Sequence, residues 1–207
     1  MSPPESNSRA DHDLSPEAVE DLAGRAQAGD RMAFDGLVNI FWSDIVRLAY
    51  YRTGSAQDAE DLAQEIFLKA FRSIKSLRQP AHFKPWLYRI AVNKVTDHHR
   101  KRRLRSIFTS LDGPEGDSIP EPPDLESPSP LDQAARRQFW RLVDDFCASL
   151  PRREREVFTL RFMDQLTIGE IAQVLRRSQS AVKTHLYRAV AKFQKKPALI
   201  NAIRGLS

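Results

Sequence analysis

The chain has 207 residues, 41% of them apolar, and a formal net charge of +5, so it is long enough for two small domains with real cores. The single cysteine, Cys147, excludes an internal disulfide, and no Cys/His spacing of zinc-site type occurs, so we expect no metal site and no cofactor. No apolar run approaches the roughly 18 residues of a membrane span, and the polar start lacks the apolar part of a signal peptide. We therefore expect a cytoplasmic protein without membrane insertion.

Charge is segregated along the chain. Residues 88–105 carry seven Arg or Lys against one Asp, whereas residues 106–135 carry seven Asp or Glu, no base and six prolines. From residue 136 onward 15 basic residues face 6 acidic ones. The basic segments favour a polyanionic partner. The Pro-rich acidic segment favours a flexible linker over residues 106–133.

The first predicted domain covers residues 16–105 and follows a polar tail, residues 1–15, that we expect to be disordered. Apolar spacing predicts helices at about 16–28, from Asp30 onward, and over 55–77. No β-alternating stretch of useful length occurs, so the predicted fold class is all-α. The 55–77 helix begins with a capping-box pattern, Ser55 followed by Asp58. Its predicted inward residues are Ala59, Leu62, Ala63, Ile66, Phe67, Ala70, Phe71 and Ile74.

The stretch 81–105, AHFKPWLYRIAVNKVTDHHRKRRLR, combines aromatic rings with dense positive charge. If most of it is helical, one face packs inward and one flank carries Trp86, Asn93, Asp97 and Arg100. A ring with amide and guanidinium groups along one strip can stack on bases and hold phosphates. The strip is therefore a candidate surface for single-stranded nucleic acid. The alternative, which the pattern leaves open, is that Trp86 is half-buried against the 55–77 helix.

A second, smaller helical domain is expected over residues 134–207. Thr167 and Glu170 form a capping box before a short apolar stripe, and Ser178 can cap a longer helix. Two short amphipathic helices joined by a tight turn are the arrangement of a DNA-binding helix-turn-helix. The positions predicted to reach bases and phosphates are Arg177, Ser178, Ser180, Lys183, Thr184, Tyr187 and Arg188. The alternative is a small bundle with a solvated basic face.

Four segments, in this order, resemble the extracytoplasmic function (ECF) type of bacterial RNA polymerase sigma factor, group 4 of the sigma-70 family. They are DAEDLAQEIFLKAFRSIKSL, FKPWLYRIAVNKVTDHHRKRR, LPRREREVFTLRFMDQLTIGEIAQVL and SAVKTHLYRAVAKF. The resemblance covers about residues 20–205. It implies a promoter-specificity (sigma) subunit that directs transcription initiation and is not an enzyme. The first domain would resemble sigma region 2 and the second would resemble region 4.

The resemblance also implies roles for individual residues. The first domain would bind the opened -10 strand through Lys84, Trp86, Arg89, Asn93, Lys94, Asp97, Arg100 and Lys101. It would bind the β′ clamp helices of core RNA polymerase through Asp58, Asp61, Gln64 and Glu65, although the spacing alone would favour plain solvation of these carboxylates. The second domain would bind -35 duplex promoter DNA and the polymerase β flap. A separate anti-sigma factor is implied as a further partner, and Val190 stands where many members have Arg.

Two other classes of function compete with this interpretation. An autonomous helix-turn-helix regulator would need a self-complementary interface or a ligand pocket in its first domain. A nuclease would need carboxylates near the basic groove to hold a metal, whereas the densest acidic segment here is the Pro-rich linker.

Overall fold

A computed structural model describes residues 15–108 and 130–205, with side chains described for 15–102 and 138–202. All of the regular secondary structure in these ranges is helical, which confirms the predicted all-α class. None of these helices combines the length and apolarity needed to cross a bilayer. The expected tail, apart from residue 15, and residues 109–129 of the expected linker lie outside the described part of the chain.

The first domain is built from four long helices: α1 (Pro16–Gln27), α2 (Arg31–Thr53), α3 (Ala56–Ser73) and α4 (Phe83–Phe108). Two 3-10 turns, η1 (Ile74–Ser76) and η2 (Pro80–His82), connect α3 to α4. Predicted caps start two of the helices, since the Asp30 carboxylate accepts the Ala33 amide at 3.1 Å and the Ser55 hydroxyl accepts the Asp58 amide at 3.2 Å. Gly54, with φ of 74°, ends α2 in the left-handed conformation that favours glycine.

The core of this domain lies between α2, α3 and α4. Leu37, Ile45, Ile66 and Leu87 are all 0% exposed. Phe71 was expected to face inward but is 44% exposed. Its ring instead packs edge-on against Phe34 at a centroid distance of 5.1 Å, on the outside of the α2–α3 contact.

The second domain comprises α5 (Pro130–Ser149), α6 (Arg152–Phe162), α7 (Ile168–Leu175), α8 (Gln179–Phe193) and α9 (Pro197–Gly205). A core cluster of its own gathers α5, α6 and α8 around Phe146, whose ring lies 5.1 Å from that of Phe158 and 5.6 Å from that of Phe193. The buried residues under α7 and α8, among them Ile171 and Val182, belong instead to the same apolar cluster as the core of the first domain.

Two helix boundaries differ from the expected linker limits. Helix α4 continues to Phe108, past the expected end at 105, and residues 106–108, Ser-Ile-Phe, include no proline or glycine that would end a helix. Helix α5 begins at Pro130 rather than at 134, and proline is well tolerated in the first turn of a helix.

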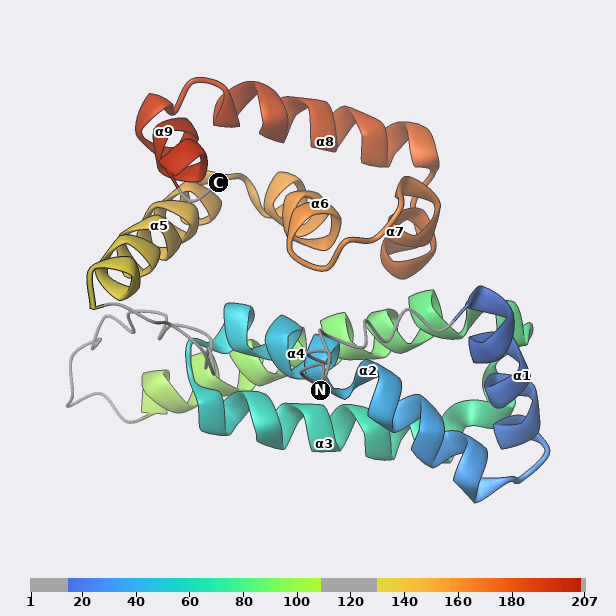
Figure 1. Ribbon diagram of the computed structural model, residues 1–207. Helices are drawn as coiled ribbons and strands as arrows, with labels where there is room; N and C mark the ends of the chain where they lie inside the picture. The colour runs from blue at the N-terminus through green and yellow to red at the C-terminus, as the bar shows by residue number, and fades with distance from the viewer. Residues whose placement is uncertain (1–14, 109–129, 206–207) are drawn as a thin grey trace, which may run out of the picture.

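The two domains also pack together. Helices α5–α9 lie on one side of the α1–α4 bundle (Figure 1), and α7 contacts α4 directly. The sequence had suggested two modules joined only by a tether, because nothing in its local patterns marks a contact between distant helices.

Candidate nucleic-acid and polymerase interfaces

Helices α7 and α8 form the predicted helix-turn-helix. The capping box is complete: the Glu170 amide donates to the Thr167 hydroxyl at 3.2 Å, and the Thr167 amide donates to the Glu170 carboxylate at 2.7 Å. Arg176, with φ of 51°, ends α7 in the left-handed region. Ser178 then caps α8 by accepting the Ala181 amide at 3.3 Å. The sequence could predict these caps because each bond joins residues three positions apart.

The outer face of α8 is open to solvent. All seven side chains predicted to bind -35 DNA are exposed, and Tyr187 is 68% exposed. Val182, Leu186 and Ala189 occupy the inner face and are buried. Within the described part of the chain, no carboxylate pairs with Lys183 or Arg188. An exposed helix face with uncompensated cations is suited to phosphates and base edges in a major groove.

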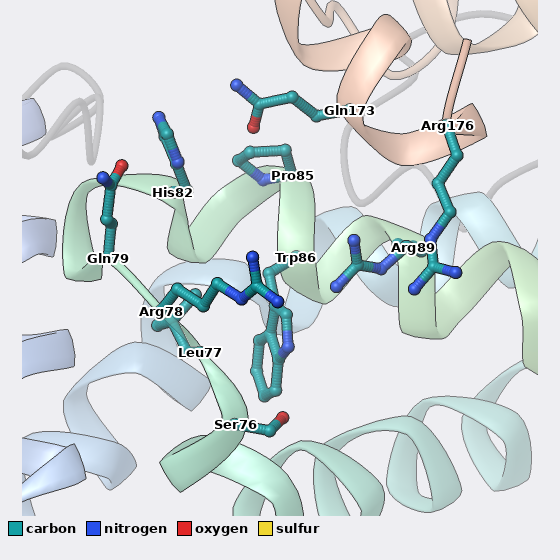
Figure 2. Close-up of a pocket in the computed structure, with 10 residues that line it drawn as sticks. All are labelled: Ser76, Leu77, Arg78, Gln79, His82, Pro85, Trp86, Arg89, Gln173 and Arg176. Carbon is teal, nitrogen blue, oxygen red and sulfur yellow. The ribbon is translucent and has the colours of Figure 1, made fainter.

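The strip predicted on α4 is only partly accessible. Trp86 is 6% exposed and packs against Phe83 at a centroid distance of 5.8 Å. Its ring points from α4 toward Ser76 and Leu77 (Figure 2), so the connection between α3 and α4 buries it. Of the two alternatives that the sequence left open for Trp86, a ring open for base stacking and a ring packed beside α3, the structure supports burial. The sequence could not show that the connection between α3 and α4 supplies part of the cover.

Trp86 nonetheless lies at the edge of a cleft of about 860 Å³. The cleft is lined by Ser76, Leu77, Arg78, Gln79, His82, Pro85, Trp86 and Arg89 from the first domain and by Gln173 and Arg176 from the second. None of these lining residues is acidic. Burial, and then the neighbouring Arg176 charge, lowers the pKa of Arg89. The cleft therefore offers concentrated positive charge beside an aromatic ring.

The other predicted -10 residues lie on the accessible side of α4 or pair with neighbours. Asn93 and Lys101 are exposed, and Arg100 pairs with Asp97 at 3.2 Å. Lys94 donates to Glu65 of α3 at 2.8 Å. Lys84 lies 3.7 Å from Glu170 of α7. Lys94 therefore ties α4 to α3, and Lys84 ties α4 to the second domain.

The predicted polymerase-binding side chains fall into two places. Asp58, Asp61 and Glu65 line a charged cleft of about 380 Å³ between α3 and α4. Lys94, Asp97 and Lys101, which were predicted to bind the -10 strand, line the same cleft. The hydrogen bond from Lys94, and then its charge, lower the pKa of Glu65 below its ordinary range. Gln64 instead lies on the opposite side of α3. The two predicted functions thus share one cleft, which a pattern read along single helices could not reveal.

Gln64 borders an apolar groove that sequence reasoning missed. The groove lies between α2 and α3 and has a volume of about 590 Å³. Its apolar side chains are Phe34, Val38, Trp42, Phe67, Leu68 and Phe71. Leu68 is 54% exposed and lies off the predicted inward stripe, which is the one signal in the sequence that could have identified the groove.

Each of the two domains matches a known protein family. Residues 37–105 match the Sigma-70 region 2 family, and residues 141–193 match the Sigma-70, region 4 family. The ECF RNA polymerase sigma factor BldN of Streptomyces coelicolor is 38% identical over 82% of this chain, and the match covers 62% of that protein. The ECF RNA polymerase sigma factor SigW of Bacillus subtilis is 30% identical over 79% of this chain and 88% of its own length.

A solved structure supports the same assignment. CnrH, in complex with the cytosolic domain of CnrY, matches with a TM-score of 0.62 and 25% identity, over 89% of this chain and 98% of that chain. Because two sigma-70 regions match in order and an ECF relative is covered over most of its length, the chain belongs to the ECF sigma factors, the promoter-specificity subunits of bacterial RNA polymerase.

Proposed function

We propose that this sigma factor reads the -35 element as duplex with α8 and the -10 element as an opened strand with α4 and the loop before it. The exposed outer face of α8 is the observation that carries the proposal. Lys183 and Arg188 stand on that face without a described carboxylate partner, and Ser180 and Thr184 are exposed on it as well. Such a face can contact phosphates and base edges at the same time.

For the -10 strand, the cationic cleft beside Trp86 supports the proposal. Arg78 and Arg89 can neutralise phosphates there. Extruding a base costs a few kcal/mol of unstacking, so a pocket that binds the base offsets part of that cost. Two weak contacts on one chain also reinforce each other, because the second becomes intramolecular.

The proposed protein partners follow from two surfaces. Core RNA polymerase would bind α3 through its β′ clamp helices and the second domain through its β flap. An anti-sigma factor would cover the polymerase-binding surfaces, and the complex of CnrH with CnrY supports a partner of this kind. As a sigma subunit the chain regulates transcription in the cytoplasm without a reaction of its own.

A selection on genomic DNA tests the proposal. Sheared genomic fragments are incubated with core polymerase, with or without this chain, and the retained fragments are sequenced. Permanganate reactivity then maps the thymines in opened DNA. We expect retained fragments to share two motifs, with opened thymines only at the downstream one. Retention of specific fragments by the chain alone, unchanged by polymerase, would instead support an autonomous regulator.

A further inference from the structure

Three arginines from distant parts of the chain extend into the cationic cleft. Arg78 lies in the connection between α3 and α4, Arg89 lies on α4, and Arg176 ends α7 in the second domain. Figure 2 shows the side chains of Arg78 and Arg89 pointing toward each other beside Trp86, while Arg176 reaches from α7 toward Arg89. The cleft therefore gathers cations from both domains.

The protein itself does not neutralise these three cations. Among the residues that the structure describes, the side chains of Arg78, Arg89 and Arg176 form no ion pair and no hydrogen bond. No residue that lines the cleft is acidic. Burial, and then the charge of Arg176, lowers the pKa of Arg89. Like charges held close together repel, and more strongly away from bulk water, so an anion in the cleft would relieve an unfavourable arrangement.

The rest of the cleft wall is also suited to an anion. The N-terminal end of α4, which carries a partial positive charge, borders the cleft through Pro85 and Trp86. Gln79 and Gln173 line it on the two sides, and their side-chain amides can donate hydrogen bonds. Both domains therefore supply charge and hydrogen-bond donors to the same space.

The size and charge of the cleft define the class of ligand. Its volume of about 860 Å³ falls in the range of small-molecule sites, about 300 to 1,000 Å³. Guanidinium groups bind phosphate oxygens through paired hydrogen bonds. Three such groups on separate segments match several linked phosphoryl groups better than one phosphate. Trp86 is only 6% exposed, so the site offers little ring surface to a base.

We propose that this cleft binds a short polyphosphate, inorganic or part of a nucleotide, that bridges Arg78 and Arg89 of the first domain to Arg176 of the second. The bound anion replaces the repulsion between Arg89 and Arg176 by an attraction to each of them. Because the ligand contacts both domains, it stabilises their packed arrangement. The concentration of a soluble polyphosphate therefore sets how firmly the two domains are held together. This effector site goes beyond the proposed function, although the backbone of a single strand presents the same phosphate chemistry.

Titration calorimetry of the full-length chain with tripolyphosphate tests the site, at about 0.15 M salt so that exposed charges are screened. We expect saturable binding, at least about tenfold tighter than that of orthophosphate, because a single phosphate reaches fewer of the arginines. Arg78→Gln and Arg176→Gln should each weaken binding at least about tenfold, the loss expected for one hydrogen bond between charged groups. Both positions are exposed, so the substitutions leave the cores intact.

Arg177→Gln is the matched control. Arg177 follows Arg176 directly and is also exposed, but it lines a separate cleft beside α6. Its substitution removes the same charge from the same turn and should change the affinity for tripolyphosphate by less than about twofold. Equal weakening by Arg177→Gln and Arg176→Gln would overturn a defined site in favour of general attraction to a basic surface.

Two further outcomes would also overturn the inference. A loss of affinity in only one of Arg78→Gln and Arg176→Gln would contradict a ligand that bridges the domains. A labelled random-sequence single strand of about 20 nucleotides, followed by anisotropy, separates the effector from DNA. Strand binding that depends on Arg78, without saturable binding of tripolyphosphate, would assign the arginines to the strand alone. That result would overturn the effector site and leave the proposed function standing.

Discussion

Replacing Ile171 by alanine should destabilise the helix-turn-helix more than the same change three residues earlier. Ile171 is 0% exposed and sits among the buried residues under α7 and α8. The change removes three carbon groups at about 0.8 kcal/mol each, or about 2.4 kcal/mol. The cavity left behind adds to this, and buried Ile→Ala changes cost about 2 to 5 kcal/mol in total. We expect a loss of about 3 kcal/mol.

Ile168→Ala is the matched control, because it removes the same atoms from the same helix at a half-buried position. Its cost should stay near 1 kcal/mol, in proportion to the smaller area buried. Native-state hydrogen exchange of the α8 amides reports the free energy of opening this domain in the intact chain. Equal losses in the two variants, or a loss below about 1 kcal/mol for Ile171→Ala, would refute the assignment of Ile171 to the core.

Three further predictions concern DNA binding and titration. Arg188→Ala should weaken binding of the polymerase complex to -35 duplex by about 1 to 3 kcal/mol if Arg188 contacts a base. If it contacts a phosphate, the slope of log affinity against log salt concentration should fall in magnitude by about 1. Anisotropy at several salt concentrations measures both effects, and binding to core polymerase should not change. Asn93→Ala should reduce permanganate reactivity at the -10 region more than it reduces closed-complex formation, and equal reactivity would exclude Asn93 from strand capture. Burial, and then the neighbouring Asp145 charge, raises the pKa of Asp144 from 3.8 to about 6, so the folded chain holds this proton more tightly and the free energy of unfolding falls as pH rises through that interval. Asp144→Asn should therefore stabilise the protein at pH 7 but not at pH 4, by about 1 kcal/mol once solvent screening of the half-exposed group is allowed for; urea unfolding at both pH values decides.

Features that depend on a few neighbouring residues could be predicted from the sequence. The caps at Asp30, Thr167 and Ser178 join residues close in the chain, and the inward stripe of α8 follows from helical spacing. The folded chain keeps these local features because they agree with its tertiary packing.

Features that depend on distant segments could not be predicted. The sequence left the burial of Trp86 undecided, because part of its cover comes from the loop that connects α3 to α4. Phe71 stays exposed because it packs at the edge of α2. The pairing of Arg52 with Asp164 spans 112 positions, and nothing near either residue marks it. Some of the residues that line the cationic cleft were therefore predicted, while the wall contributed by α7 was missed.

Run-off transcription most directly tests the claim that this chain specifies promoters. Core RNA polymerase is given a fragmented genomic library with and without the protein, and transcript starts are mapped, with Arg188→Ala in parallel. The account predicts new starts downstream of one shared -35/-10 pair, weakened in Arg188→Ala. An unchanged set of starts, with salt-sensitive binding of the protein alone to specific duplexes, would contradict it.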